Sequence, residues 1–348
     1  MGLDVPAKKR SSDSPFQQNP KVLLALVVLA IAIGIGASVA LSGKDPLRVV
    51  ALFPWWVWPV TLGMIVLGWN VNALRYRMLL KSQGVATRHR DNVGVVMATE
   101  FGYVATPFGS GGPATFIWLN VRRGISPAVA GGVFALDQML DLVFFLSALP
   151  LVTIGLIGLP GRFHWGAEIV LMAVLLGAAL LGAGLALRHH RVALRGGSML
   201  FDRLRVRGRW RHRLTRFVLR LRLAIVEGLR MSRGRLLALY GLCALHWLLR
   251  YGVLFVLVAA LGLSASFSYA FFVQLVTMGL GQVSSLPGGA GAVEVSFSVL
   301  LAPMVPTAMV GVLLLAWRFV TFYWYLIAGG AVFALYMLGA RRKARGVA

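Results

Sequence analysis

Long apolar stretches without regular alternation of polar positions dominate the chain. Six of them hold close to the 20 or so mostly apolar residues that a helix needs to cross a bilayer. Charged side chains are sparse within these stretches and gather between them. The pattern predicts an all-α integral membrane protein with about six full transmembrane helices, at Val22–Leu41, Val49–Ala73, Pro127–Thr153, Gly166–Leu187, Leu236–Leu261 and Thr307–Leu338.

Two further apolar stretches are interrupted in the middle. Residues 102–118 read GYVATPFGSGGPATFIW, and residues 281–297 read GQVSSLPGGAGAVEVSF. Proline and glycine weaken helices, and non-helical backbone at membrane depth survives only where protein or a water-filled cavity covers it. We therefore expect two re-entrant helix–break–helix hairpins, although loops, kinked helices or paired short crossings are alternatives. The breaks are expected at Pro107, Gly109, Gly111 and Gly112, and at Pro287, Gly288, Gly289 and Gly291.

The two broken segments occupy matching places in two halves of the chain. Pro107 and Pro287 are 180 positions apart, and the tripeptide Leu-Arg-Tyr precedes each of them, at 74–76 and at 249–251. The long helices before and after the breaks are expected to run in opposite senses in the two halves. This order predicts an inverted-topology repeat, with units at about 49–153 and 236–339. Such repeats are typical of transporters with a site near the membrane midplane.

The distribution of basic residues predicts the orientation in the membrane. Nearly all of them fall in the N-terminal tail and in segments 75–91, 122–123, 188–235 and 341–348. The opposite segments, 42–48 and 158–165, contain only Lys44, Arg48 and Arg162. Because cytoplasmic loops carry an excess of Lys and Arg, we expect both termini in the cytoplasm and the protein in the cytoplasmic (inner) membrane. This bias accounts for the net charge of +24 without a nucleic-acid partner.

The same pattern divides the chain into regions. Residues 1–20 are expected to form a disordered cytoplasmic tail, 21–340 one transmembrane domain, and 341–348 a basic cytoplasmic tail. The loop 188–235 joins the two units and contains 15 arginines. A polybasic loop is attracted to any anionic leaflet, which is the simpler interpretation. Selective binding of phospholipid headgroups is the alternative.

Ionisable residues within the apolar stretches are costly and mark functional sites. Asp137 and Asp141 are four positions apart and therefore share a helix face. Arg318 follows the second break, 181 positions after Asp137, so we expect it to face the two aspartates across a polar cavity. Glu100, Arg250 and Glu294 complete the set.

These charges have two interpretations. A buried Asp–Arg pair could simply fix helix packing. Alternatively, the cavity could bind a charged headgroup, with free amides at Gly109–Gly112 and Gly288–Gly291 for a phosphate. Charge-assisted bonds would then come from Arg250, Arg318 and Arg75. The candidates for proton coupling are Asp137, Asp141 and Glu294.

No catalytic or metal-binding signature occurs in the sequence. The single cysteine, Cys243, excludes a multi-cysteine metal site, and no two histidines are paired at helical spacing within an apolar stretch. His246 is expected to be a packed histidine. Walker loops, nucleophile elbows and zinc motifs are absent. We therefore expect no cofactor, no metal and no enzymatic activity.

The order of motifs resembles a known family. It comprises Arg75-x-Arg77 with Leu79, Leu80 and Gly84, the TPFGSGGPATF break, the helix of Asp137 and Asp141, LPGGAGAVE at 286–294, and Arg318-Phe-Val-Thr-Phe-Tyr-Trp. Over about residues 20–340 the chain is similar to the transmembrane, flippase-like domain of lysylphosphatidylglycerol synthases. The resemblance implies movement of an aminoacylated phospholipid between leaflets. The chain ends at Ala348, soon after its last helix, so we expect the soluble synthase half to be absent.

The sequence thus favours translocation or binding of an anionic or amphipathic lipid across the cytoplasmic membrane, with membrane lipids as partners. Two alternatives remain. One is a membrane enzyme of lipid, isoprenoid, hopanoid or lipid-linked glycan metabolism. The other is an accessory subunit that has a lipid-synthesis enzyme as its partner.

Overall fold

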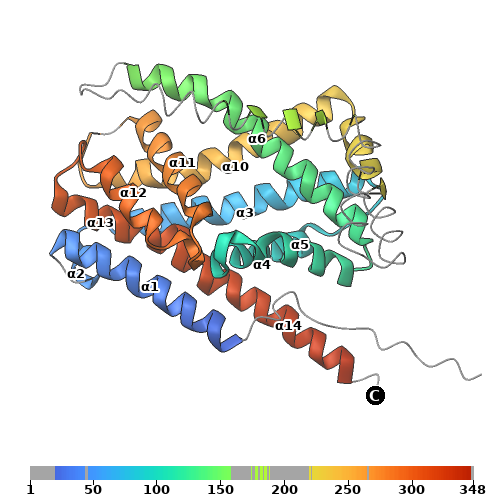
Figure 1. The fold of residues 1–348 in the computed structure, drawn as a ribbon, viewed down its shortest axis with the longest axis horizontal. Helices are drawn as coiled ribbons and strands as arrows, with labels where there is room; N and C mark the ends of the chain where they lie inside the picture. The colour runs from blue at the N-terminus through green and yellow to red at the C-terminus, as the bar shows by residue number, and fades with distance from the viewer. Residues whose placement is uncertain are drawn as a thin grey trace, which may run out of the picture.

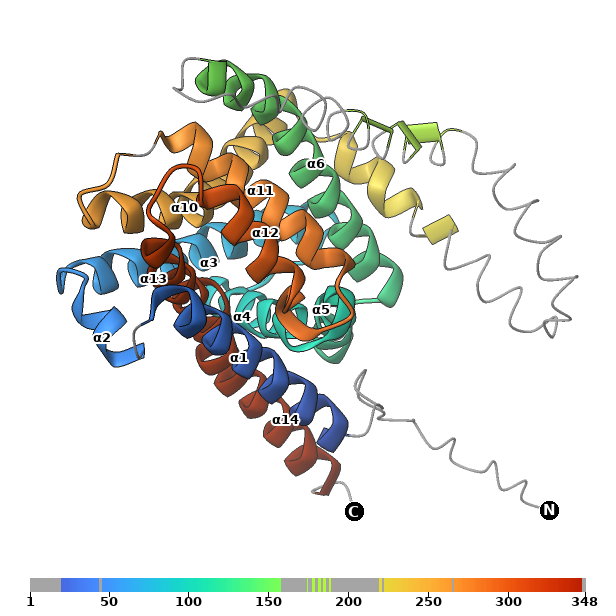
Figure 2. The ribbon, with the colours of Figure 1, turned by 60° about the vertical axis from the view of Figure 1, so that its left-hand side comes forward.

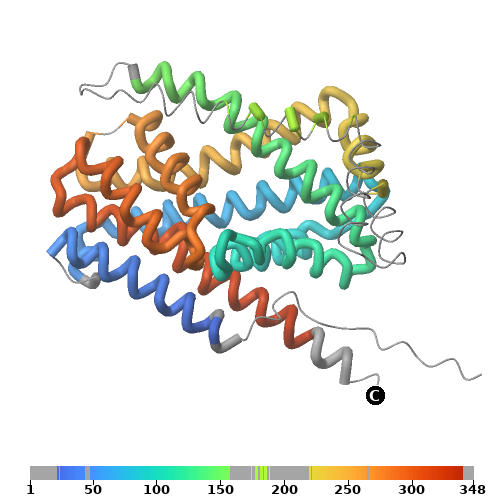
Figure 3. The backbone as a smooth tube through the Cα atoms, viewed as in Figure 1, coloured from blue at the N-terminus to red at the C-terminus, as the bar shows by residue number. Residues whose placement is uncertain are grey.

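The computed structural model is helical throughout the residues that it describes, which are 20–43, 46–157, 219–220, 222–264 and 266–345, with single residues between 174 and 188. Figures 1 and 3 show long helices that cross one another in a bundle, with shorter helices at its centre. The helix bounds are α1 Pro20–Ser42, α2 Pro46–Ala51, α3 Val57–Ser82, α4 His89–Ala105, α5 Gly111–Arg122, α6 Pro127–Ile157, α10 Arg233–Ala260, α11 Phe267–Val283, α12 Ala292–Leu301, α13 Thr307–Arg318 and α14 Gly330–Arg345.

Five helical runs in the described part are long and apolar enough to cross a membrane. They are Leu24–Ser42, Val57–Ser82, Pro127–Leu156, Arg233–Ala260 and Thr307–Gly339. The last run joins α13 to α14 through two π-helical segments, Phe319–Tyr323 and Tyr325–Gly329. The prediction of an all-α membrane protein is confirmed. The remaining predicted span, Gly166–Leu187, lies largely outside the described residues.

The second span is shifted relative to the predicted Val49–Ala73. The short helix α2 ends at Ala51, and α3 begins only at Val57, because Pro54 between them cannot donate a helical hydrogen bond. The helix then continues to Ser82. Arg75, which the sequence assigns to a cytoplasmic segment, therefore lies inside α3 and is 1% exposed.

Both interrupted segments fold as two short helices joined by a 3-10 turn. α4 and α5 flank the turn Pro107–Gly109, and α11 and α12 flank the turn Pro287–Gly289. At 1.5 Å per residue these four helices are about 15–25 Å long, which is shorter than a hydrocarbon core of about 30 Å. Figure 1 shows the two hairpins approaching from opposite ends of the bundle, with their turns meeting at its centre. There the Phe108 amide donates to the Ser284 carbonyl at 3.3 Å.

The two turns have the same backbone conformation. After each proline comes a left-handed residue, Phe108 (φ 55°, ψ 16°) or Gly288 (φ 61°, ψ 17°). A left-handed glycine follows, Gly109 (φ 64°) or Gly289 (φ 69°). Phe108 is the only non-glycine residue with positive φ in the described chain, and this conformation costs about 1–2 kcal/mol. Two segments 180 positions apart thus make the same turn.

Close helix contacts hold the bundle together around this centre. α3 and α10 approach each other where His246 Nδ1 lies 3.1 Å from the carbonyl oxygen of Gly68. His246 is 3% exposed, which confirms the prediction of a packed histidine. α1 lies along α13, as Figure 2 shows, and a Cβ at Gly311 would come within 2.6 Å of the α1 backbone at Ser38.

The geometry of the second turn predicts a difference between two substitutions. Gly288→Ala should lower the unfolding temperature in detergent for two reasons. The added Cβ would clash with the ring of Phe322, and alanine would be strained by the positive φ of residue 288. Phe108→Gly removes only a left-handed penalty of about 1 kcal/mol and should leave the unfolding temperature equal or higher. Equal tolerance of both substitutions would contradict the turn conformation.

Candidate functional site

A cavity of about 470 Å³ lies where the two turns meet. This volume falls within the range of small-ligand sites. Phe108 and Gly109 from the first turn and Gly288 and Gly289 from the second form part of its wall. The charged residues of the wall come from α3, α4, α6, α10 and α13, and they are Arg75, Glu100, Asp137, Asp141, Arg250 and Arg318.

Arg75 joins α3 to α6 through two carboxylates. Its Nε lies 2.5 Å from Asp137 Oδ1, and its Nη1 lies 2.9 Å from Asp141 Oδ1. Asp141 Oδ1 also accepts hydrogen bonds from Trp247 Nε1 at 2.8 Å and from Cys243 Sγ at 3.3 Å, both on α10. A single guanidinium therefore serves two carboxylates, and Asp141 connects three helices.

Arg250 on α10 is bonded less completely. Its Nη1 lies 3.1 Å from Oε2 and 3.2 Å from Oε1 of Glu100 on α4. Its Nε is buried without a hydrogen-bond partner. The guanidinium lies over the rings of Trp247, at 5.6 Å, and Tyr325, at 5.1 Å from the ring centroids. Arg250 lines the cavity and is more exposed, at 15%, than Arg75 or Arg318.

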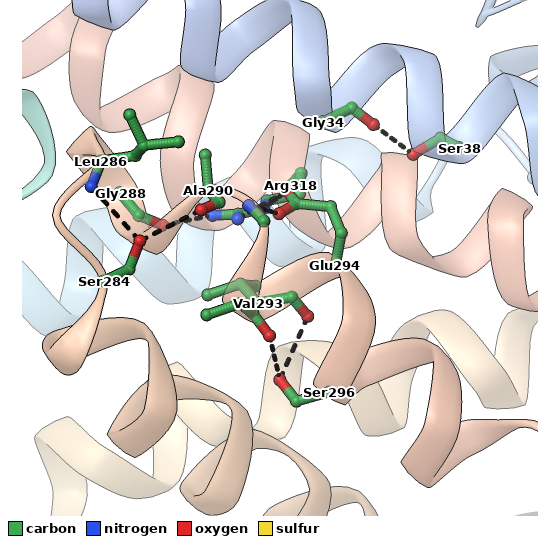
Figure 4. Close-up of polar contacts among 12 residues, drawn as sticks. Gly34, Ser38, Ser284, Leu286, Gly288, Ala290, Val293, Glu294, Ser296 and Arg318 are labelled. Atoms are coloured by element: carbon green, nitrogen blue, oxygen red, sulfur yellow. Dashed lines mark hydrogen bonds and ion pairs between the residues drawn. The ribbon is translucent and has the colours of Figure 1, made fainter.

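Arg318 is tied to the second hairpin, as Figure 4 shows. Its Nη2 and Nε lie 2.6 and 2.8 Å from Glu294 Oε1, and its Nη1 donates to the Gly288 carbonyl at 2.8 Å. Glu294 Oε2 accepts from the Gly291 amide at 2.7 Å, so the same carboxylate caps α12. α1 passes beside this pair, and a Cβ at Gly34 would lie 3.3 Å from Glu294 Oε1. The Arg318–Glu294 pair therefore holds the turn and α12 against α13.

The expectation that Arg318 and the two aspartates line one polar cavity is confirmed, but their interpretation as a direct Asp–Arg pair is wrong. All three residues line one cavity, but the aspartates bind Arg75 and Arg318 binds Glu294. Matching places in two halves indicate a similar depth in the bundle, whereas pairing depends on which carboxylate a guanidinium can reach. The sequence places Arg75 in a cytoplasmic segment, and this assignment hides the true partner of the aspartates.

The prediction of free turn amides for a phosphate is wrong for most of the turn residues. The Gly111 amide donates to Thr106 Oγ1 at 2.7 Å, and the Gly291 amide donates to the carboxylate that caps α12. The amides of Gly109 and Gly289 donate to carbonyls three residues earlier. A buried amide without a partner bears its full desolvation penalty, so bonds within each turn are favoured. Any headgroup contact must come chiefly from side chains.

The structure separates the predicted site residues into two groups. Those in the cavity wall are Arg75, Gly109, Asp137, Asp141, Arg250, Gly288, Gly289 and Arg318. The others shape the hairpins. Pro107 and Pro287 open the turns, Gly111 and Gly112 let α5 approach α4, and Glu294 with Gly291 caps α12.

Several uncharged cavity residues are absent from the sequence prediction. Asn72 on α3 is 5% exposed, and its Oδ1 is buried without a partner. Trp247 contacts both Asp141 and Arg250. It stands three residues before Arg250 on the same helix face, and an aromatic residue at that spacing from an intramembrane arginine is the signal that could have identified it.

The Arg318–Glu294 contact predicts that losing one partner harms the protein more than losing both. Arg318→Gln should lower folded yield and unfolding temperature strongly, since an uncompensated buried charge costs about 3–5 kcal/mol. Adding Glu294→Gln should restore much of this loss, because two amides can bond to each other. As a control, Asp137→Asn combined with Arg318→Gln should be additive. Rescue within that control would reinstate the pairing rejected above.

Comparisons with known proteins agree with this architecture. Residues 22–329 match the family model of the lysylphosphatidylglycerol synthase TM region. A UPF0104 membrane protein of Archaeoglobus fulgidus is 26% identical over 266 residues, covering 75% of this chain and 80% of that protein. A UPF0104 membrane protein of Methanothermobacter thermautotrophicus is 35% identical over 94 residues, which are 27% of this chain and 28% of that protein. The chain is thus a multi-pass membrane protein that belongs to the lysylphosphatidylglycerol synthase TM region family.

Proposed function

We propose that this protein binds the headgroup of a membrane lipid in its central cavity and moves the lipid across the cytoplasmic membrane. The observation that carries the proposal is the cavity of about 470 Å³ with six charged residues in its wall. Ionisable groups inside a membrane bundle mark substrate or ion pathways. Broken helices that meet at a central site are typical of transporters built from repeats.

The proposal treats the two hairpins as re-entrant and the two halves as an inverted repeat. Each half has a long helix, a hairpin with a 3-10 turn and a second long helix. The first long helices, α3 and α10, run in opposite directions between the ends of the bundle in Figure 1. The matching turn dihedrals support the same interpretation. Both turns would then lie near the membrane midplane.

The two chain ends support a common side for the termini. The start of α1 and the end of α14 lie toward the same side of the bundle in Figures 1 and 2. The basic residues of the tails would place that side in the cytoplasm. The loop between α2 and α3 would then face outward, and the loop between α3 and α4 would face the cytoplasm.

Arg250 is the proposed contact for the headgroup. The donors of Arg318 point to Glu294 and to the second turn, and Arg75 is held between two aspartates. The Arg250 side chain is 15% exposed, against 1% for Arg75 and 3% for Arg318, so its guanidinium is the one within reach of an oxygen of a phosphate or another acidic headgroup. The rings of Trp247 and Tyr325 restrain the plane of its guanidinium.

The outer face of the second hairpin offers a place for the lipid chains. An apolar groove of about 670 Å³ runs between α11 and α12, which also supply the cavity wall on their other face. Its wall includes Leu280, Val283 and Val295, with Ser284 and Ser285 near the turn. A lipid whose headgroup enters the cavity needs an apolar path for its tails, and this groove supplies one beside the hairpin.

Substituting Arg250 should separate lipid transport from folding. Arg250→Gln alone leaves Glu100 unpaired, so the informative variant combines it with Glu100→Gln. This double variant should fold to near parental yield yet lose at least tenfold in the rate of lipid movement, measured by dithionite quenching of NBD-labelled phosphatidylglycerol in proteoliposomes. Arg122→Gln, which changes an arginine stacked on Trp118 away from the cavity wall, is the control. Unchanged movement in the double variant would contradict the assignment of Arg250.

The proposed orientation can be tested by labelling of single cysteines. Trp55 is 81% exposed between α2 and α3, and Ala86 is exposed between α3 and α4. Trp55→Cys should react with an impermeant maleimide on intact cells, whereas Ala86→Cys should react only after the membrane is opened. The parent protein should stay unlabelled because Cys243 is buried. The reverse pattern would invert the topology.

A further inference from the structure

The buried charges around the cavity do not balance. Arg318 pairs with Glu294, and Arg250 pairs with Glu100, so each of these guanidiniums has one carboxylate. Arg75 alone serves two, Asp137 and Asp141. Four carboxylates therefore accompany three guanidiniums at this site within the described chain.

The excess negative charge falls at one well-defined place. Asp137 and Asp141 lie on one face of α6, and Arg75 between them is 1% exposed. Asp137 is also 1% exposed, whereas the side chain of Asp141 is 14% exposed and borders the cavity. Burying an uncompensated charge costs several kcal/mol. Two carboxylates that share one site relieve this cost by retaining a single proton between them.

Among the residues that the structure describes, no further guanidinium or ammonium group forms an ion pair with these two aspartates. Across the cavity, the nearest further guanidiniums are already matched to Glu100 and Glu294. The packed His246 uses its Nδ1–H to donate to the Gly68 carbonyl. The ionisable groups that face the pair are Arg75 and Tyr76 from α3, Glu100 and Tyr103 from α4, Cys243, His246, Arg250 and Tyr251 from α10, and Arg318 from α13. The cavity residues of α11 are uncharged.

We propose that Asp137 and Asp141 form a proton-binding site that carries one proton in the resting protein and exchanges it through the cavity. On release, the O–H bond of the carboxyl breaks and a cavity water takes the proton, which leaves both carboxylates on Arg75. On rebinding, the proton returns to the pair. Both aspartates line the cavity, and Asp141 provides the route because its side chain is 14% exposed, against 2% for Asp137.

The structure narrows the choice among the acids that the sequence suggests for proton coupling. Both oxygens of Glu294 are engaged, Oε1 by Arg318 and Oε2 by the Gly291 amide. These bonds tie Glu294 to α13 and to the start of α12, so it fixes the hairpin. In the aspartate pair, by contrast, two carboxylates share a single guanidinium, so one negative charge has no counter-charge. Coupling of this proton to lipid movement rests on the proposed function, whereas the bound proton itself does not.

Infrared spectroscopy of the full-length protein in nanodiscs tests the bound proton directly. At neutral pH the parent protein should show the C=O stretch of a protonated carboxyl group, with the shift in D2O that marks an exchangeable proton. Asp137→Asn and Asp141→Asn should each lose this band, since the remaining aspartate then pairs alone with Arg75. Glu294→Gln and Asp91→Asn should keep it, and Asp91 is a matched acid with a side chain 53% exposed.

The parent spectrum decides the matter even where a variant folds poorly. Absence of the protonated band in the parent, or its persistence in both aspartate variants, would refute the site. Loss of the band on adding Na⁺ at constant pH would assign the site to a metal cation and would also overturn the proposal. Arg75→Gln should instead strengthen the band, because neither aspartate then has a counter-charge.

Proteoliposomes test the coupling separately. With NBD-labelled phosphatidylglycerol and a trapped pH dye, an imposed pH gradient should change the rate of lipid movement severalfold in the parent and not in Asp141→Asn. Equal rates in the parent with and without the gradient would refute coupling. If no lipid moves while the infrared band is present, the proposed function and the coupling both fail, and the proton-binding site stands.

Discussion

A buried guanidinium keeps its charge and is costly to bury unless a carboxylate lies beside it, and this constraint organises the centre of the protein. Arg75 connects α3 with α6, Arg250 connects α10 with α4, and Arg318 connects α13 with α12. Each link joins segments that hydrophobic packing alone would leave free to slide or rotate, since lipid tails are as apolar as the side chains. The ion pairs thus fix the depth and rotation of the helices that surround the cavity.

The same links assign different roles to three arginines that look alike in sequence. Arg318 is used fully by the second turn, and Arg75 is shared by two acids. Arg250 has one partner and a buried, unbonded Nε. Most backbone amides of the two turns are likewise already bonded, to groups within their own hairpins. The hydrogen-bond donors at the cavity therefore come mainly from side chains rather than from free backbone amides.

The features predicted well from sequence are those that depend on local residue types. Pro107 and Pro287 break their helices wherever they stand, and apolar length alone identifies the spans. The partner of each charge depends instead on how the helices rotate and cross, which sequence spacing does not determine. The sequence therefore paired Arg318 with Asp137 and Asp141, whereas the structure pairs it with Glu294. Arg75 was misplaced because counting basic residues assumes that they lie in loops. Pro54 moved the start of α3, and side-chain caps removed the expected free amides.

Asp137 and Arg318 carry opposite charge, and each is neutralised within its own part of the chain, Asp137 by Arg75 on α3 and Arg318 by Glu294 on α12. The third link differs, because Arg250 on α10 and Glu100 on α4 come from different halves of the chain. A displacement of one half against the other would leave the first two links intact and separate the third. Separating a buried ion pair costs about 3–5 kcal/mol unless new partners replace the lost one. The Arg250–Glu100 pair is thus a latch whose opening sets an energetic threshold for relative movement of the two halves.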